Sequence, residues 1–182
     1  MQLIFATSNE GKLREAREVL GLSISGTSLE IDEIQSLDPV SVAQKKALAY
    51  YEKLKKPIFV EDVSLTFNAF MNLPGTYIND FYKSLGNVGL IKLLEGRKDR
   101  RATAQTTIVY IDKNKKSHIF VARINGSIST KVLGTKGFGW DPIFIPSGQP
   151  KTFAQMAAGE KNKYSMRAIA LKQFEVWLGS SK

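Results

Sequence analysis

The sequence of 182 residues contains no cysteine and only one histidine, His118. The absence of cysteine excludes disulfide bonds, thiolate catalysis and zinc sites with cysteine ligands, and a single histidine excludes metal sites that need several imidazoles. Any bound metal must therefore be a hard ion with oxygen ligands, which favours Mg²⁺, with Mn²⁺ as the second choice.

Long apolar runs are missing as well. No stretch approaches the roughly 18 apolar residues that cross a bilayer, and acids and lysines stand where a signal peptide would continue its apolar core. With 43% hydrophobic residues, the chain can bury a substantial core. We expect one cytoplasmic domain over residues 1–182 and no membrane partner.

Basic residues outnumber acidic ones by 26 to 17, which gives a formal charge of +9 and suits a polyanionic partner. The densest basic run, residues 97–101, falls between an expected helix and an expected strand. Nucleic-acid surfaces interleave basic residues with aromatic ones. We interpret this run as a solvated loop, so nucleic acid is not the expected partner.

The first dozen residues are typical of a phosphate-binding turn. Small polar residues at 7–9 separate an apolar strand at 3–5 from a helix expected at 10–20. The start of that helix would direct free N–H groups at a ligand, Gly11 would allow close approach, and Lys12 would add a full charge. An ordinary capped helix after an edge strand also fits this stretch.

Carboxylates follow two further apolar segments. Residues 58–60 form an expected buried strand that runs directly into Glu61 and Asp62, and residues 29–34, where apolar and acidic residues alternate, form another expected strand with Glu33 at its far end. Ligand crevices in open α/β sheets lie outside the carboxyl ends of strands. Alternatively, one of the adjacent acids points to solvent and the other caps a turn.

The remaining pattern indicates α/β structure followed by antiparallel strands, hence a mixed sheet flanked by helices. We expect further helices at 38–54, 77–85, 88–94 and from Ser165, and further strands at 64–70, 102–111, 117–124 and 127–133.

A glycine-rich segment at 134–144 carries Phe138, Trp140 and Asp141. Aromatic residues on such a loop can stack on a planar base, although an aromatic turn packed under the sheet is the alternative. In the last helix, Arg167 lies off the apolar stripe near the N-terminus, where a cation needs an anion opposite it.

These pieces together describe a nucleoside triphosphate site. Cations and the first turn would bind the phosphates, carboxylates would bind Mg²⁺ and the aromatic loop would bind the base. Without a cysteine or an obvious histidine base, the expected reaction is metal-assisted attack of water on phosphorus, with an Asp or Glu activating the water.

Seven motifs, in order along the chain, resemble the inosine triphosphate pyrophosphatase family. They are residues 7–12 (TSNEGK), 33–35 (EIQ), 60–62 (VED), 73–75 (LPG), 137–142 (GFGWDP), 152–156 (TFAQM), and 160–162 (EKN) with Ser165 and Arg167. The resemblance implies hydrolysis of ITP, dITP and XTP to the monophosphate and pyrophosphate. It also implies an elongated mixed α/β sheet with two lobes and a central cleft, and a homodimer.

The resemblance also implies a role for each site residue. Asp62 would activate water, with Glu61 in reserve and Lys12 beside them, and Glu33 and Asp62 would bind Mg²⁺. Substrate would contact the remaining residues: Thr7, Ser8, Asn9, Glu10, Gly11, Lys12, Lys46 (with Lys45 as the second choice), Phe138, Gly139, Trp140, Asp141, Lys161, Met166 and Arg167.

Four positions depart from the family pattern. Val63 replaces a hydroxyl residue, Asn79 stands where some relatives have lysine, and Ser8 replaces a frequent glycine. Met166 replaces the histidine expected near the purine 6-oxygen, so discrimination against ATP or GTP should weaken. Met166 could equally be a core residue on the apolar stripe.

Two alternative functions remain open. A Maf-like pyrimidine triphosphate pyrophosphatase would share the general architecture, although residues 137–142 and 160–167 favour the purine enzyme. A nucleotide- or nucleic-acid-binding protein with weakened catalysis would be consistent with Val63 and Met166.

Overall fold

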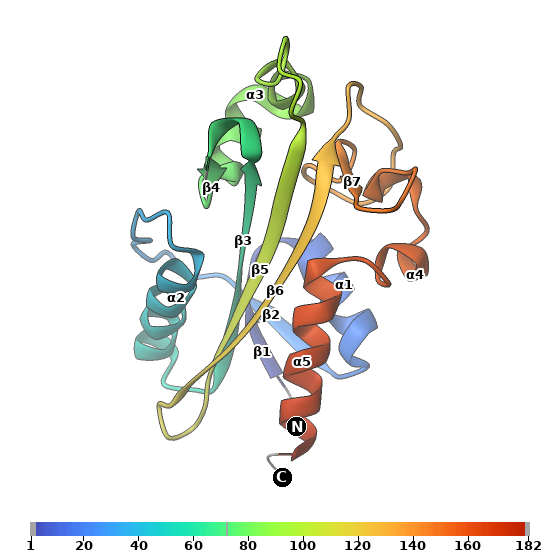
Figure 1. Ribbon diagram of the computed structural model, residues 1–182. Helices are drawn as coiled ribbons and strands as arrows, with labels where there is room; N and C mark the ends of the chain where they lie inside the picture. The colour runs from blue at the N-terminus through green and yellow to red at the C-terminus, as the bar shows by residue number, and fades with distance from the viewer. Residues whose placement is uncertain (1–2, 72, 181–182) are drawn as a thin grey trace. The chain divides into compact units, whose positions relative to one another are not determined.

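The computed structural model describes residues 3–71 and 73–180. Seven strands form one mixed sheet in the order β2-β1-β3-β5-β6-β7, and β4 pairs with β3 (Figure 1). None of the helices in the described ranges is long and apolar enough to cross a membrane.

The chain divides into two compact units. Unit 1 comprises residues 3–62, 106–122 and 167–180, and unit 2 comprises residues 63–105 and 123–166. Strands β3 (Ile58–Phe67), β5 (Arg101–Ile111) and β6 (Ser117–Ile128) contribute residues to both units. The single functional domain and the central cleft stay predictions.

Unit 1 is built on parallel strands. β1 (Leu3–Ala6) pairs in parallel with β2 (Ile24–Thr27) on one side and with β3 on the other. The predicted helices at 10–20 and 38–54 are confirmed as α1 (Glu10–Leu20) and α2 (Pro39–Leu54). The side chains of Asn9 and Asp38 cap them by accepting hydrogen bonds from free backbone N–H groups.

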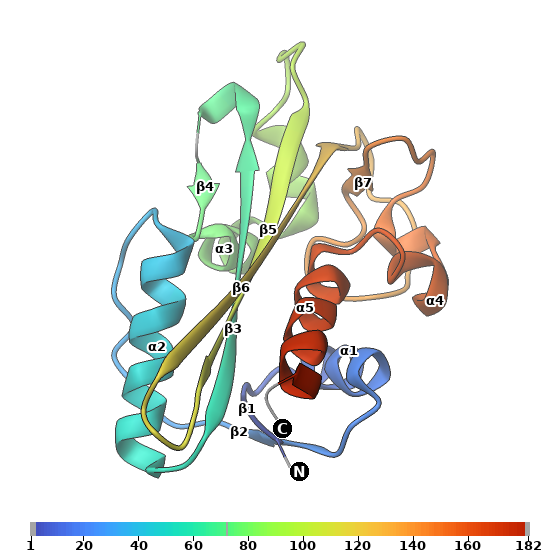
Figure 2. The ribbon, with the colours of Figure 1, turned by 60° about the horizontal axis from the view of Figure 1, so that its bottom comes forward.

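The two faces of the unit 1 sheet are covered by different helices. Figures 1 and 2 show α1 and α5 (Met166–Ser180) side by side on one face and α2 on the other. Alternate residues of β3 face opposite sides. Val60 joins the apolar cluster with α2, while the Phe59 ring packs against Phe5 and against Phe174 of α5. Glu61 therefore belongs to the α5 face and Asp62 to the α2 face.

Unit 2 holds the other ends of β3, β5 and β6 and the shorter elements. These are η1 (Asn68–Phe70), β4 (Pro74–Gly75), α3 (Ile78–Lys92), β7 (Phe144–Pro146), η2 (Phe153–Gln155) and α4 (Ala158–Lys161). The predicted pair of helices at 77–85 and 88–94 corresponds to α3, which is broken at Gly86 by a φ of 63°.

The predicted strand at 29–34 is wrong. This segment is not a strand but runs along α2, where Leu29 exchanges two hydrogen bonds with the Tyr50 hydroxyl. Leu29 and Ile31 pack against the apolar cluster under α2. The alternation of apolar and acidic residues at 29–34 therefore reflects packing against α2. The segment forms no strand, because β2 occupies the position beside β1 in the sheet.

Two predicted strand ends are also wrong. β3 continues through Glu61 and Asp62 to Phe67, because its second half pairs with β4. The parallel pairing with β1, however, reaches only to Val60.

At the other end of the sheet, β6 continues to Ile128 and residues 129–133 form no strand. Asn125-Gly126 is no turn, because β7 pairs there: a Cβ on Gly126 would lie 2.3 Å from the Ile145 carbonyl oxygen.

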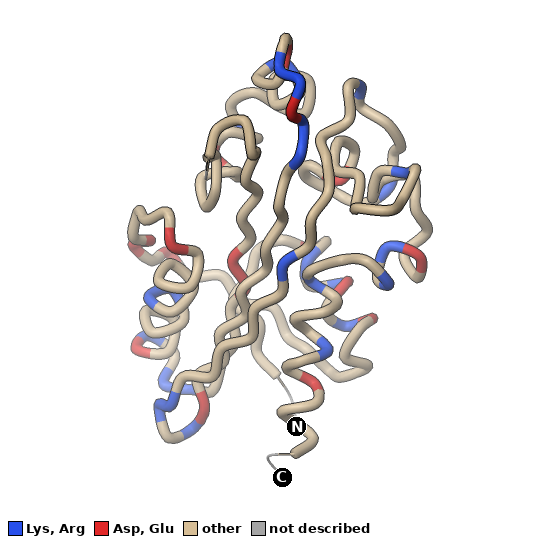
Figure 3. The backbone as a smooth tube through the Cα atoms, in the orientation of Figure 1, with Lys and Arg blue, Asp and Glu red and all other residues tan. Residues whose placement is uncertain are grey.

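The basic run at 97–101 lies between α3 and the start of β5, as predicted. Figure 3 shows basic and acidic positions following one another there. Asp99 pairs with Arg101 through two hydrogen bonds, and Arg100 donates to three backbone carbonyls. The guanidinium groups of Arg100 and Arg101 are therefore engaged in contacts within unit 2.

Candidate active site

The turn after β1 has a preorganised shape. The Thr7 hydroxyl accepts a hydrogen bond from the Asn9 N–H at 3.1 Å, and the Asn9 side chain accepts one from the Lys12 N–H at 3.1 Å. Because Ala6 lies beside Val60 in the parallel pairing, the turn follows next to Glu61. Ser8, Asn9 and Glu10 are exposed and available to a ligand.

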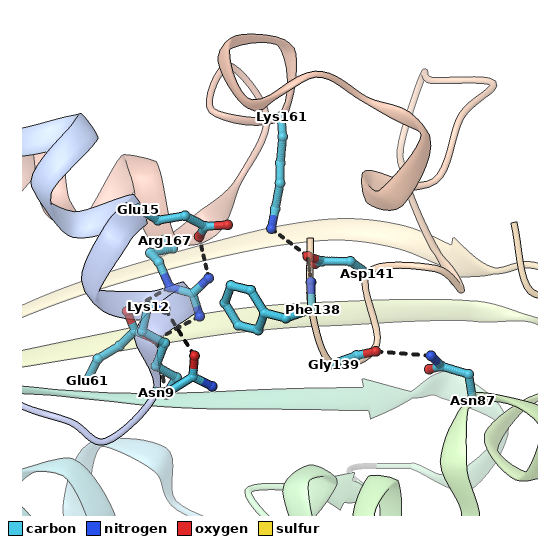
Figure 4. Close-up of polar contacts among 10 residues, drawn as sticks. All are labelled: Asn9, Lys12, Glu15, Glu61, Asn87, Phe138, Gly139, Asp141, Lys161 and Arg167. Carbon is cyan, nitrogen blue, oxygen red and sulfur yellow. Dashed lines mark hydrogen bonds and ion pairs between the residues drawn. The ribbon is translucent and has the colours of Figure 1, made fainter. Parts of the chain in front are cut away.

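Glu61 gathers the cations of unit 1. Its carboxylate accepts two hydrogen bonds from Arg167, at 2.8 Å from Nε and 2.9 Å from Nη2, and lies 3.2 Å from the Lys12 ammonium. Arg167 also pairs with Glu15 of α1 through Nη1, at 2.5 Å. We call Lys12, Glu15, Glu61 and Arg167 the Glu61 cluster (Figure 4).

The charges of this cluster stabilise one another. Burial alone would raise the pKa of Glu61, but Arg167 and Lys12 outweigh burial and lower it to about 2. Burial likewise opposes the charge of Arg167, while Glu61 and Glu15 raise its pKa. The position of Arg167 near the start of α5 predicted that an anion lies opposite it. The carboxylates of Glu61 and Glu15 supply this negative charge.

Asp62 has the opposite character. Burial raises its pKa to about 6, although the charges of Lys12 and Lys46 lower it, and Glu33 and Glu61 raise it further. Within the described residues, its buried Oδ2 atom has no hydrogen-bond partner. A buried oxygen without a partner is costly unless something binds it.

Glu33 and Lys46 form an ion pair of 2.6 Å in unit 1. The side chain of Lys46 is only 18% exposed, whereas Lys45 is exposed, and the choice of Lys46 for substrate binding stays a prediction. Among the described residues, no group of three or more His, Asp or Glu side chains is arranged to hold a metal ion. Asp62 and Glu33 still fit Mg²⁺, which commonly takes one or two carboxylates and completes its shell with water and substrate phosphates.

In unit 2, the aromatic loop (residues 137–141) is held by Asp141. Its Oδ2 atom accepts hydrogen bonds from the Phe138 N–H at 2.9 Å and from the Lys161 ammonium at 2.7 Å. Asp141 and Lys161 are buried, and the ammonium also lies 5.1 Å from the Phe138 ring centroid. A Cβ on Gly137 would lie 2.1 Å from the same carboxylate oxygen, so only glycine fits there.

The structure separates the predicted base-pocket residues into two groups. Lys161 joins the aromatic loop of unit 2, whereas Arg167 joins Lys12 in unit 1. Met166, which we assigned to substrate, is only 3% exposed.

Two residues that contact the candidate site were not predicted from the sequence. Glu15 lies three positions after Lys12 on α1, and that helical spacing could have revealed it. Asn87, whose amide contacts the aromatic loop, gave no signal because 52 positions separate the partners.

Comparison with known proteins identifies the family of the chain. A model of the Ham1 family matches residues 3–177. The dITP/XTP pyrophosphatase of Thermococcus kodakarensis is 41% identical, over 98% of this chain and 97% of the relative. The inosine triphosphate pyrophosphatase of Yarrowia lipolytica is 39% identical, over 98% and 96%.

Among solved structures, a HAM1 protein from Coxiella burnetii has a TM-score of 0.85 and 27% identity, and 99% of each chain is covered. These matches confirm the mixed α/β fold and the family resemblance carried by the seven motifs. The chain belongs to the Ham1 family.

Proposed function

We propose that the protein hydrolyses non-standard purine nucleoside triphosphates (ITP, dITP and XTP) to the monophosphate and pyrophosphate, which removes them from the nucleotide pool. The Glu61 cluster supports this proposal most directly, because it holds Lys12 of the turn after β1, and the charge of the same Lys12 also lowers the pKa of Asp62. The printed names of the relatives, dITP/XTP and inosine triphosphate pyrophosphatase, support the same reaction.

In unit 1, the residues from Thr7 to Lys12 would bind the triphosphate through N–H groups, the α1 dipole and the Lys12 charge. Lys46 would add a second cation. Glu61 holds Lys12 and Arg167 in place through ion pairs, and its own low pKa makes it a poor proton acceptor.

Asp62 is the better general base of the two adjacent acids. Without a metal ion, burial raises its pKa to about 6, well above that of Glu61, so Asp62 is the more basic of the two carboxylates. The activated water would attack phosphorus as the bond between the α- and β-phosphates breaks.

Mg²⁺ would be held by Asp62 and Glu33, with Mn²⁺ as a substitute. When bound, the ion supplies charge neutralisation to the phosphates. The unpartnered Oδ2 atom of Asp62 supports this assignment.

In unit 2, the aromatic loop would recognise the base. Phe138 and Trp140 offer aromatic faces, and Lys161 and Asp141 offer a buried donor and acceptor. Because Met166 stands where the family has histidine, we expect weaker discrimination against ATP and GTP. Phosphate and metal chemistry in unit 1 should be unaffected by that change.

Turnover of a nucleotide panel tests the proposal. Pyrophosphate and monophosphate release should be measured with ITP, XTP, dTTP, UTP, ATP and GTP, with Mg²⁺, with Mn²⁺ and with EDTA. We expect ITP and XTP to be preferred and EDTA to abolish turnover. Preference for UTP or dTTP would instead identify a Maf-like enzyme, and turnover of none would overturn the enzymatic proposal.

We also propose a homodimer located in the cytoplasm. Sedimentation of the purified chain tests the dimer, which a monomer at micromolar concentration would contradict. Fractionation of the source cells tests the location.

A further inference from the structure

Asn87 of α3 contacts the aromatic loop within unit 2. Its Nδ2 donates a hydrogen bond of 3.0 Å to the carbonyl oxygen of Gly139, the central residue of the loop (Figure 4). Phe138 and Trp140 flank this glycine, so the contact acts between the two rings proposed to recognise the base.

Other contacts act on the residues on either side of Gly139, and the Trp140 carbonyl accepts a hydrogen bond from the Ile143 N–H at 3.1 Å while its ring packs edge-on against Phe144. Asp141 and Phe138 exchange hydrogen bonds, since Asp141 Oδ2 accepts from the Phe138 N–H and the Asp141 N–H donates to the Phe138 carbonyl at 3.2 Å. Gly139 has a φ of 61° and an open space where a Cβ would stand, so neither a side chain nor crowding restrains it. Asn87 therefore fixes the peptide that joins Gly139 to Trp140.

The break in α3 sets the direction of Asn87. Gly86 adopts φ 63° and ψ −178°, which interrupts the helix immediately before Asn87. A left-handed φ at this position suits glycine because it has no Cβ. The helix then resumes, and the short amide side chain reaches the loop from its restarted first turn.

The second amide atom of Asn87 shows which of its two polar atoms makes a contact. Oδ1 is buried and, within the described part of the chain, has no hydrogen-bond partner. An unpaired buried acceptor destabilises a fold, and an alanine at position 87 would have no side-chain acceptor to leave unpaired. The benefit of asparagine must then come from the donor that holds Gly139.

We propose that Asn87 is a positioning residue that sets base selection by holding the Gly139 carbonyl, and through it Phe138 and Trp140, in one arrangement. This inference rests on the proposed function, because it assigns base recognition to the aromatic loop.

The kinetic test compares Asn87→Asp, which lacks the donor but keeps the size, with Val88→Ala. Val88 is the next residue of α3, is 59% exposed and has no part in the site. For Asn87→Asp we expect KM for ITP to rise about threefold to tenfold, the range for one lost hydrogen bond. The ratio of kcat/KM for ITP to that for GTP should fall, while kcat stays within about twofold of wild type.

Inhibition by inorganic tripolyphosphate serves as the internal control, because this probe carries phosphates and no base. Its inhibition constant should be equal in wild type, Asn87→Asp and Val88→Ala. An unchanged KM and base preference in Asn87→Asp would overturn the inference. So would an equal loss for ITP and tripolyphosphate, which would indicate general damage.

A readout without turnover separates this inference from the proposed function. In a Trp177→Phe background, Trp140 is the only tryptophan, because the chain has two. We expect Asn87→Asp to change the intensity or wavelength of its emission and Val88→Ala to leave both unchanged. If wild type hydrolyses no nucleotide, the proposed function fails, and unchanged Trp140 emission would separately refute the role of Asn87.

Discussion

The Glu61 cluster of unit 1 and the aromatic loop of unit 2 bind their charged groups in different ways. In unit 1, one carboxylate on a strand holds Lys12 and Arg167 from two helices. In unit 2, Asp141 holds Lys161 and the backbone of its own loop. The first arrangement is fixed by regular elements, and the second depends on side chains that restrain a glycine-rich turn.

We infer from this difference that the two units have different roles in binding the substrate. Phosphates and a metal are the same in every nucleoside triphosphate, so a rigid cluster of fixed charges suits them. The base differs between substrates, and a loop held by a few hydrogen bonds can be tuned without disturbing the sheet. Changes in unit 1 should therefore reduce catalysis for all substrates, and changes in unit 2 should alter the choice among them.

The largest expected effect is that of Asp62→Asn. Losing the proposed base should lower kcat by about 10³-fold for every nucleotide, within the range for general base catalysis. Steady-state pyrophosphate release measures the loss, and circular dichroism checks the fold. Asp80→Asn, an exposed acid on α3, is the matched control and should keep wild-type turnover. Comparable activity in the two variants would remove Asp62 from the mechanism.

Glu61→Gln should have the next largest effect, on stability. Removing one partner of a buried ion pair leaves Arg167 partly uncompensated and should lower the free energy of unfolding by about 3 kcal/mol. Urea denaturation monitored by circular dichroism measures it. Glu52→Gln removes an exposed partner of Lys115 and should cost far less. If both variants unfold at the same urea concentration, the buried pair contributes no more than a surface pair.

Lys12→Ala should raise KM for ITP, XTP and GTP alike by about tenfold or more, the range for a charged hydrogen bond. The inhibition constant of tripolyphosphate should rise by the same factor. Lys83→Ala, which removes an exposed lysine of α3, is the control. A KM equal to that of wild type would mean that the turn after β1 is structural.

The smallest effect is expected for Phe138→Ala. Losing one stacking face should raise KM for ITP by about fivefold to tenfold, the lower part of the range for one stacked base, with tripolyphosphate inhibition unchanged. If tripolyphosphate inhibition weakened as much as ITP binding, the proposed division between the units would be wrong.

Local signals in the sequence predicted much of the fold correctly. Asn9 and Asp38 marked the starts of α1 and α2 because an N-cap is an interaction over two or three positions. Strand ends could not be predicted from local signals. Whether a strand ends at Glu61 depends on whether β4 pairs with the residues beyond it.

By itself, the sequence determined the helix starts, the family and the residue types of the site, because caps, motifs and charges are written in adjacent positions. Which carboxylate pairs with Arg167, and which has a buried oxygen without a hydrogen-bond partner among the described residues, depends on the tertiary structure. Glu61 and Asp62 are neighbours in the chain, yet strand alternation sends one towards Arg167 and the other towards α2. The same holds for Asn87 and Gly139, which meet only because the chain folds back over 52 positions.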